Sequence, residues 1–343
     1  MGHVAVRNGS ALGIVNHPMK KVLGIGNALV DILITLENDK KLLLLNLPKG
    51  SMRLVDKDQS NAILDSLKEY SRIQAAGGSA ANTIHGLAKL GVPAGYIGMI
   101  GEDELGGFFV TDMIDAGVEP IMIHSVEQTG RATALITPDS ERTFATCLGA
   151  AIGLSAGHID RLSTVFGKYD ILHLEGYLAQ NHELIEKALA EAKKNNLLVS
   201  LDLASYNVVE GNLDFLERMI KKYVDIVFAN EEEAKSFTGE DPREALTSIS
   251  KACKIAVVKT GKNGSLIHAG NEIIEIGIIP VTPLDTTGAG DLYASGFLFG
   301  IANDLPLKRC GEIGALLAGN VVEVMGAKMP EERWINILNT VTG

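Results

Sequence analysis

The stretch DTTGAGD, residues 285–291, places two glycines and an alanine between two carboxylates and leads directly into an apolar segment. A helix that begins here has main-chain N–H groups without intrahelical partners, and its dipole makes that end positive. Gly288, Ala289 and Gly290 therefore suit an anion cradle, because glycine lets a ligand approach the backbone closely. Asp291 would stand beside the anion and accept a proton from an attacking hydroxyl. Together these groups have the chemistry of phosphoryl transfer.

Two simpler readings of such glycine motifs have to be weighed. An aspartate near a helix start is also an ordinary capping or first-turn residue, so Asp291 alone would indicate little. No GxxxxGK[ST] sequence occurs in the chain, which excludes a P-loop. The GIGN stretch at residues 24–27 begins like a dinucleotide fingerprint, but Leu29 stands where the third glycine belongs. A nicotinamide oxidoreductase is therefore a weaker hypothesis than a phosphotransferase.

The elements that must position these residues follow a regular order. Strand-like and helix-like segments alternate along residues 21–343, which predicts one α/β domain with a mostly parallel sheet covered by helices. Ligands in such sheets bind beyond the carboxyl ends of the strands. Residues 32–56 and 119–147 contain strand-like runs separated by turn residues and not by helices, which predicts a small second sheet. Residues 1–20 are predicted to be a loose N-terminal extension. Helices are predicted over residues 289–302, 307–324 and 331–340.

Composition restricts the function further. The chain has 343 residues and a formal net charge of −11, which argues against nucleic acid as its main partner. Cys147, Cys253 and Cys310 are far apart and show no metal-ligand spacing, which favours a reducing, cytoplasmic location. No apolar stretch is long enough to predict a membrane span.

Four motifs in order resemble those of the ribokinase/PfkB family of carbohydrate and nucleoside kinases, and the adenosine-kinase-like members most. They are DTTGAGD, AGGSAANTIHGLAKLG at residues 76–91, GIGNALVDI from Gly24, and ANEEEA around Asn230 and Glu233. The resemblance extends from about Lys21 to the C-terminus. It implies a ribokinase-like three-layer sandwich with a central, mostly parallel sheet and a small β-sheet lid formed by the two irregular segments.

The resemblance also implies roles for the acceptor side of the site. Asp291 would be the catalytic base, and the main-chain amides of residues 288–291 would form the anion hole. The predicted substrate-binding residues are Asn27, Asp31, Gly77, Gly78, Asn82 and Glu175. A carboxylate suits sugar hydroxyls, and a double glycine allows close contact. The structural alternative for Asn27 and Asp31 is turn chemistry at a strand end, and that for Gly77 and Gly78 is a loop before a helix capped by Ser79.

On the nucleotide side the resemblance implies ATP and Mg²⁺. Asn230 and Glu233 would organise magnesium and the phosphates through water, since magnesium keeps much of its water shell. The predicted ATP-binding strand and turn, VVKTGKNGS, contain Lys259, Gly261 and Gly264. Many family members have Thr where Lys259 stands, so the main-chain role carries over better than the side chain. A charged helix start and a simple hairpin are the structural alternatives.

Asp285 and Thr287 are the candidates for a monovalent cation, K⁺, which family members often hold near the anion hole. Asp285 could equally be a turn residue. Lid strands in the family often mediate dimers, which makes a homodimer through the lid an expectation by analogy.

We therefore expect an ATP-dependent kinase that phosphorylates a primary hydroxymethyl group of a small sugar or ribonucleoside. The alternative is a non-catalytic sensor of sugars or nucleotides with the same fold. The sequence leaves open the acceptor, the oligomeric state, the cation dependence and the role of the N-terminal extension.

Overall fold

Buried aliphatic runs form a nine-stranded sheet in the order β14-β13-β12-β11-β10-β9-β1-β5-β6. This computed structural model describes residues 19–139 and 141–342, so the predicted extension over residues 1–20 lies almost entirely outside it. The strands are Val22–Ile25 (β1), Ala94–Gly101 (β5), Val118–Ser125 (β6), Ile171–Glu175 (β9), Leu198–Asp202 (β10), Ile226–Asn230 (β11), Ile255–Lys259 (β12), Ser265–Ala269 (β13) and Glu272–Ile276 (β14). All pairs from β12 to β6 are parallel, and β13 and β14 extend the sheet as antiparallel strands.

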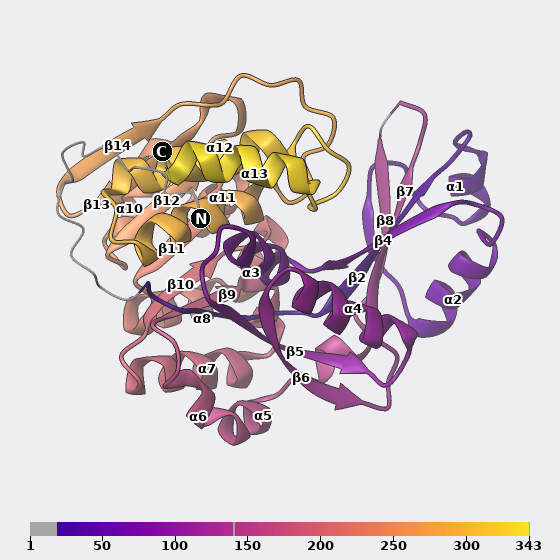
Figure 1. The fold of residues 1–343 in the computed structure, drawn as a ribbon, viewed down its shortest axis with the longest axis horizontal. Coiled ribbons are helices and arrows are strands. Elements are labelled where there is room, and N and C mark those ends of the chain that lie inside the picture. Colours follow the sequence, from indigo (N-terminus) through magenta and orange to yellow (C-terminus); the bar gives the residue numbers. More distant parts are fainter. Residues whose placement is uncertain (1–18, 140, 343) are drawn as a thin grey trace, which may run out of the picture.

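Helices cover both faces of this large sheet, because its central strands are buried on both sides and read as continuous apolar runs. One face is covered by Ser79–Lys89 (α3), Glu104–Asp115 (α4), Ala289–Ala302 (α11), Leu307–Val321 (α12) and Glu331–Thr342 (α13). The other is covered by Ala156–Arg161 (α5), Ser163–Phe166 (α6), His182–Lys194 (α7), Tyr206–Tyr223 (α8), Glu231–Thr238 (α9) and Pro242–Ser250 (α10). In Figure 1, α11–α13 and α5–α7 lie on opposite sides of the sheet. The predicted three-layer α/β sandwich is confirmed.

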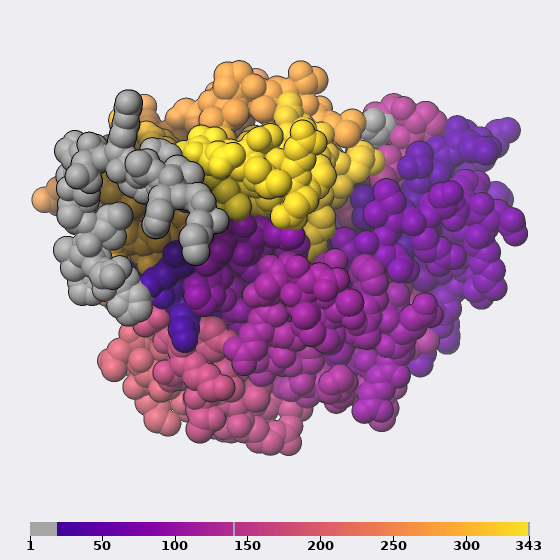
Figure 2. Space-filling model, viewed as in Figure 1, coloured from indigo at the N-terminus to yellow at the C-terminus, as the bar shows by residue number. Residues whose placement is uncertain are grey.

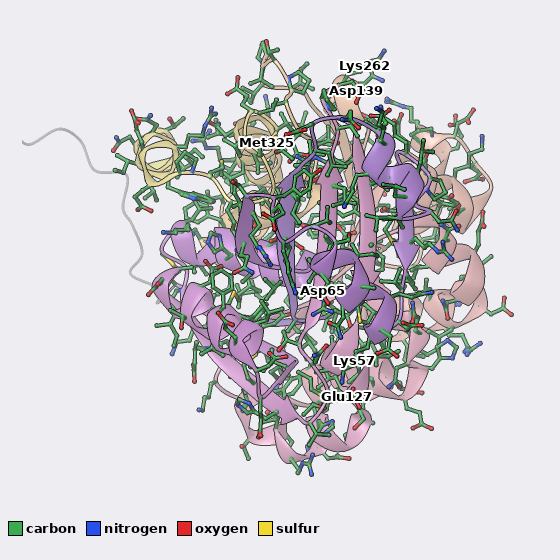
Figure 3. All side chains as sticks on the ribbon, turned by 90° about the vertical axis from the view of Figure 1, so that its right-hand side faces the viewer. Lys57, Asp65, Glu127, Asp139, Lys262 and Met325 are labelled. Atoms are coloured by element: carbon green, nitrogen blue, oxygen red, sulfur yellow. The ribbon has the colours of Figure 1, made fainter. Side chains whose placement is uncertain are left out.

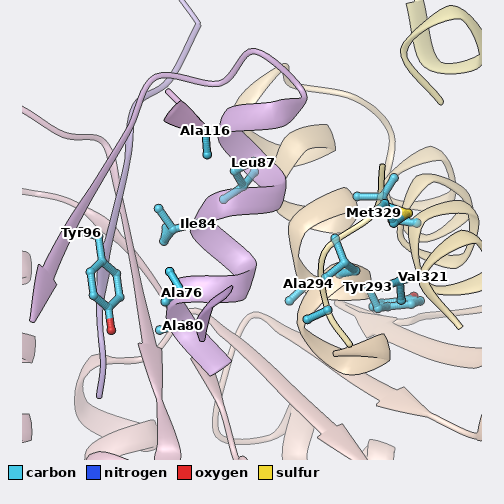
Figure 4. Close-up of a cluster of buried hydrophobic side chains, with 14 of the residues drawn as sticks. Ala76, Ala80, Ile84, Leu87, Tyr96, Ala116, Tyr293, Ala294, Val321 and Met329 are labelled. Carbon is cyan, nitrogen blue, oxygen red and sulfur yellow. The ribbon is translucent and has the colours of Figure 1, made fainter. Parts of the chain in front are cut away.

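Helix α3 packs between strand β5 and helix α11. Figure 4 shows its residues Ile84 and Leu87 between Tyr96 of β5 and Ala294 of α11. The two helices also exchange polar contacts, since the Ser295 hydroxyl donates to the Thr83 carbonyl oxygen at 2.8 Å. This packing holds α11 against α3.

A second, five-stranded sheet stands beside the sandwich, in the order β3-β8-β7-β2-β4. Its strands are Leu29–Thr35 (β2), Met52–Leu54 (β3), Arg72–Gly77 (β4), Gly130–Ile136 (β7) and Arg142–Cys147 (β8), and we call it the small sheet. Two short helices, Lys40–Leu44 (α1) and Lys57–Asp65 (α2), lie in the segments that connect these strands.

The small sheet and its helices lie at one end of the molecule, to the right in Figure 1 and in the space-filling view (Figure 2). Figure 3 turns this lobe toward the reader, with Lys57 and Asp65 on α2 and Asp139 in the turn between β7 and β8.

The predicted limits of the second sheet need two corrections. Residues 118–125 form β6, which pairs in parallel with β5 of the large sheet from Ala94↔Val118 to Gly101↔Ser125. The reason is the helix α4 between them, because a strand–helix–strand unit returns to the same sheet as a parallel neighbour. The small sheet instead gains β4, residues 72–77, which the predicted segments omitted.

Within the described part of the chain, no helix combines the length and the apolar character needed to cross a membrane.

Candidate active site

A cavity of about 1030 Å³ lies between the small sheet and the carboxyl ends of the large sheet's parallel strands. Side chains at the ends of β9 to β12 line one wall, and residues of β2, β3, β7 and β8 line the other. The predicted site residues that line it are Asn27, Asp31, Gly78, Asn82, Glu175, Asn230, Glu233, Lys259, Gly261, Thr287, Gly288, Ala289, Gly290 and Asp291. Gly77, Gly264 and Asp285 are not part of the lining. The fold thus gathers most of the predicted residues at the strand ends, where α/β sheets bind ligands.

Asp291 lies in the first turn of α11 and is held by α3. One carboxylate oxygen accepts from the Ser79 hydroxyl at 2.7 Å, and the other accepts from the Asn82 side-chain amide at 3.0 Å. Burial raises the pKa of Asp291 to about 6, although these two hydrogen bonds favour its charged form. A carboxylate with this pKa is charged at neutral pH and can accept a proton there.

The start of α11 provides the main-chain donors next to Asp291. Gly288 caps the helix in the left-handed conformation, with φ 75°, which a residue with a side chain would adopt only at a cost. The Ala289 N–H donates to the Thr286 carbonyl oxygen at 3.2 Å. Among the described residues, the N–H groups of Gly290 and Asp291 have no acceptor. The predicted anion cradle would therefore depend on the amides of positions 290 and 291 more than on that of Ala289.

Asp31, on β2 of the small sheet, is the second carboxylate of the cavity. Gly77 on the neighbouring strand β4 lies directly against it, so that a Cβ added at Gly77 would overlap the carboxyl group. Burial raises the pKa of Asp31 to about 7, with Lys328 and Arg142 opposing the shift and Asp291 adding to it. This carboxyl group is placed to accept hydrogen bonds from a ligand's hydroxyl groups.

Glu175, at the end of β9, ties two loops together behind the cavity. One of its carboxylate oxygens accepts from the main-chain and side-chain nitrogens of Asn27 at 2.8 and 2.7 Å, and the other accepts from the Ala80 N–H at 2.8 Å. Glu175 is 1% exposed, and burial raises its pKa to about 7. These hydrogen bonds position Asn27 and the start of α3. Glu175 therefore shapes the cavity by holding these two segments.

We expect Glu175→Leu to lower the free energy of unfolding by roughly 1–3 kcal/mol for each buried N–H group that it leaves without an acceptor. Urea denaturation would measure this as a lower midpoint at an unchanged slope. Glu217→Leu, at an exposed position of α8, is the matched control and should stay within about 0.5 kcal/mol of wild type. Equal midpoints for the two variants would show that Glu175 does not hold the loops.

Asn230 and Glu233 face the other end of the cavity at the start of α9. They form a reciprocal cap, in which the Asn230 side chain accepts from the Glu233 N–H and the Glu233 carboxylate accepts from the Asn230 N–H. Burial, with Asp202 adjacent, raises the pKa of Glu233 to about 7. The pair therefore fits both interpretations of the sequence, a charged helix start and a role in nucleotide binding.

The predicted nucleotide strand and turn divide into two parts. Lys259 and Gly261 line the cavity, and the Lys259 ammonium group donates to Asp202 at 2.8 Å. Gly264 instead lies against the carbonyl oxygen of Ile276 at the end of β14, where a Cβ would overlap that oxygen. Gly264 thus shapes the connection between β12 and β13 and does not face the cavity.

Asp285 and Thr287 hold the loop before α11 through contacts of their own. The Asp285 carboxylate forms an ion pair with Arg142 of β8 and accepts from the N–H groups of Thr287 and Gly326. The Thr287 hydroxyl accepts from Arg142 at 2.6 Å. A guanidinium group therefore lies where the sequence predicted K⁺, and these two side chains do not fit a monovalent cation as ligands.

Three residues of this site, Asp202, Arg142 and Lys328, were missed in the sequence analysis, and Ser79 was considered only as a helix cap. Asp202, Ser79, Arg142 and Lys328 contact or face the predicted residues. A carboxylate that ends a buried strand was a usable signal for Asp202. Arg142, at the start of β8, and Lys328, before α13, are distant in sequence from the motifs, and no local pattern indicates them.

Known proteins resemble this chain over most of its length. A model of the pfkB family carbohydrate kinases matches residues 52–334. The adenosine kinase of Saccharomyces cerevisiae is 27% identical over 296 residues, which cover 80% of this chain and 86% of the yeast protein. The crystal structure of a probable sugar kinase from Rhizobium etli superposes with a TM-score of 0.84 at 32% identity, covering 94% of this chain and 99% of the other. An adenosine kinase structure from Sinorhizobium meliloti gives a TM-score of 0.84 at 31% identity, covering 94% and 100%.

Proposed function

Because this chain belongs to the pfkB family of carbohydrate kinases, we propose that it transfers the γ-phosphate of ATP to a primary hydroxymethyl group of a furanose in this cavity. The family match favours this reaction over the non-catalytic sensor and over the nicotinamide oxidoreductase. One arrangement supports the assignment of roles most strongly: Asp291 stands beside two unpartnered amides of a helix start, and Asp31 faces the same cavity from the small sheet. An acceptor bound to Asp31 would present its hydroxyl group near Asp291.

The proposed reaction assigns each group one task. Asp291 takes the proton of the acceptor hydroxyl, whose oxygen forms a bond to the γ-phosphorus while the bond to the bridging oxygen breaks and ADP leaves. The amides of Gly290 and Asp291 donate to the phosphoryl oxygens as negative charge grows on them. Asn27, Gly78 and Asp31 position the acceptor, and Asn82 and Ser79 orient the base.

Mg²⁺ fits the nucleotide end of the cavity through water. Among the described residues, no group of three or more acidic, His or Cys side chains forms a metal cage. The Glu233 carboxylate, buried beside Asp202, would instead bind ordered waters of the ion together with Asn230. When bound, Mg²⁺ supplies positive charge to the phosphate oxygens.

The small sheet supports a ribonucleoside as the acceptor. One row of paired residues crosses neighbouring strands of this sheet and lines the cavity: Asp31, Ala132, Thr146 and Leu54. The Asp31 carboxylate lies at one end of the row, and the apolar Leu54 side chain lies at the other. Met52 and Leu54 are 56% and 54% exposed although they line the cavity. Exposed apolar surface of this kind commonly marks a binding site, and a nucleobase would cover it.

The same sheet would act as the lid of the site. A closed lid excludes water and so suppresses hydrolysis of ATP. The cytoplasmic location and a homodimer through the lid stay predictions from the sequence.

ADP release with a panel of adenosine, other ribonucleosides, ribose and fructose tests the proposed function. We expect turnover with ribonucleosides above that with free sugars, and a rise in melting temperature with the same compounds. Turnover confined to free sugars would refute the nucleoside assignment. The absence of ADP release with every alcohol tested would refute the kinase.

The pH dependence of turnover should report the protonation of Asp291 and Asp31. Asp291 has a pKa of about 6 and Asp31 of about 7, and both act in their charged forms, so kcat/KM should fall as the pH is lowered from about 7 to below 6. Ser79 donates to Asp291 and favours its charge, so Ser79→Ala should move the acid limb to higher pH. Ser66→Ala, at the exposed end of α2, serves as the control. An acid limb that is identical in all three proteins would exclude Asp291 as the titrating base.

A further inference from the structure

The charges that line the cavity are unevenly distributed. Its carboxylates belong to Asp31, Glu175, Asp202, Glu231, Glu232, Glu233 and Asp291. Among the described residues of the lining, Lys259 is the one lysine or arginine. A triphosphate that enters such a site meets repulsion, which bound Mg²⁺, helix-start amides and this ammonium group would offset.

Lys259 lies where β12 ends and points toward the start of α11. Its strand neighbour in the parallel register is Asn230 of β11, at the nucleotide end of the cavity. A Cβ added at Gly290 would lie 3.0 Å from the Lys259 Nζ atom, so the ammonium group lies beside the backbone of the anion cradle. The cradle and the ammonium group can therefore contact the same anion.

Asp202 fixes the position of this ammonium group. One carboxylate oxygen of Asp202 accepts from Lys259 Nζ at 2.8 Å, and the other accepts from the Ala204 N–H at 2.9 Å. The side chains of Lys259 and Asp202 are 15% and 7% exposed, so both are largely shielded from bulk water. Asp202 is thus anchored in its own turn and leaves Lys259 little freedom to move.

The ammonium group stays charged and keeps donors for a ligand. Burial opposes its charge, but Asp202, Glu233 and Asp291 outweigh burial and raise the pKa of Lys259. An ammonium group has three N–H donors, and Asp202 accepts from one of them. The remaining donors are available to phosphate oxygens.

We propose that Lys259 is a catalytic residue that contacts the γ-phosphoryl group of ATP as it moves, and that Asp202 is the positioning residue that aims it. This inference rests on the proposed function and adds a side-chain cation to the main-chain cradle. The γ-phosphorus passes from the bridging oxygen of ADP to the acceptor oxygen, the acceptor proton passes to Asp291, and Lys259 stays protonated throughout. Because a fixed cation stabilises the charge on the transferring group, Lys259 acts on the transition state and on the γ-phosphate of bound ATP.

The test compares two nucleotides in the absence of an acceptor. Calorimetric titration of wild type and Lys259→Met with Mg²⁺ and either ADP or a non-hydrolysable ATP analogue measures the preference for the γ-phosphate. We expect Lys259→Met to lower the affinity for the ATP analogue by roughly 10-fold or more and the affinity for ADP by less than about 2-fold. Turnover should fall by roughly 10²–10³-fold, as expected when one transition-state donor is removed.

Lys254→Met is the matched control. Lys254 precedes the same strand β12 at the opposite edge of the sheet and pairs with Asp225 at 2.8 Å, the distance found for Lys259 and Asp202. Its removal should change neither nucleotide's affinity. A loss of γ-phosphate preference in Lys254→Met that equals the loss in Lys259→Met would overturn the inference.

Asp202→Asn and the double variant complete the design. Since Asp202 acts through Lys259, Asp202→Asn should lose less γ-phosphate preference than Lys259→Met, and the double variant should lose no more than Lys259→Met. The double variant leaves no unpaired buried charge, so it gives a folded protein to titrate if Lys259→Met unfolds. Additive losses would overturn the positioning role.

Two further outcomes separate this inference from the proposed function. If Lys259→Met lowers the affinity for both nucleotides equally, or for neither, Lys259 only neutralises Asp202. That result would overturn the inference while the kinase assignment stands. Wild-type protein that binds neither nucleotide would overturn both.

Discussion

Asp291→Asn is expected to lower kcat by roughly 10²–10⁴-fold, because the amide cannot accept the proton of the acceptor hydroxyl. The substituted amide has nearly the same shape: its oxygen can still accept from the Asn82 side chain, and its NH₂ group can donate to the Ser79 hydroxyl oxygen. The acceptor KM and the melting temperature should therefore change little. Steady-state release of ADP with the best acceptor of the panel, together with a thermal unfolding curve, measures both.

The exposed aspartate of α8, Asp214, supplies the control for this change. Asp214→Asn should keep wild-type turnover. A folded Asp291→Asn variant with the kcat of wild type would exclude Asp291 as the base and would transfer that role to another carboxylate of the cavity.

Gly77→Ala is expected to lower kcat/KM for the acceptor by roughly 10–100-fold, mainly through a higher KM. The added methyl group overlaps the Asp31 carboxyl group, which must move away from the position in which it meets the acceptor. A hydrogen bond to a charged group contributes about 1.5–3 kcal/mol, which corresponds to this range. The KM for ATP should stay near its wild-type value, because Asp31 lies on the small sheet, away from the strand ends that face the nucleotide.

Gly107→Ala is the matched control for the glycine change. A Cβ at Gly107, inside α4, meets no atom within 4 Å, so alanine there should stabilise the helix by about 0.5–1 kcal/mol and leave the kinetics unchanged. If Gly77→Ala leaves the acceptor KM unchanged while its fold is intact, Asp31 does not bind the acceptor.

The fold was largely predictable because strands and helices alternate in the sequence with clear turn residues between them. The helix predicted over residues 289–302 has those bounds in the structure. The error at β6 arose because a single strand carries no mark of the sheet that it joins, although the preceding helix α4 indicated a parallel return to the large sheet.

The site was predictable where one short motif contains both the main-chain donors and the reactive side chain, as around Asp291. It was less predictable where chemistry depends on pairs from distant strands. Lys259 was recognised for its backbone, and its charge gained a role only when Asp202 and Gly290 were placed beside it. Asp285 was predicted to bind a cation, but Arg142, distant in sequence, reaches its carboxylate from the small sheet.

The most direct measurement is a crystal structure of the protein with Mg²⁺, a non-hydrolysable ATP analogue and adenosine. We expect the terminal phosphate at the amides of Gly290 and Asp291, and the acceptor's primary hydroxyl within roughly 2.6–3.2 Å of the Asp291 carboxylate. A terminal phosphate bound away from the start of α11, or a ribose whose hydroxymethyl group points away from Asp291, would contradict the proposed phosphoryl transfer at this site.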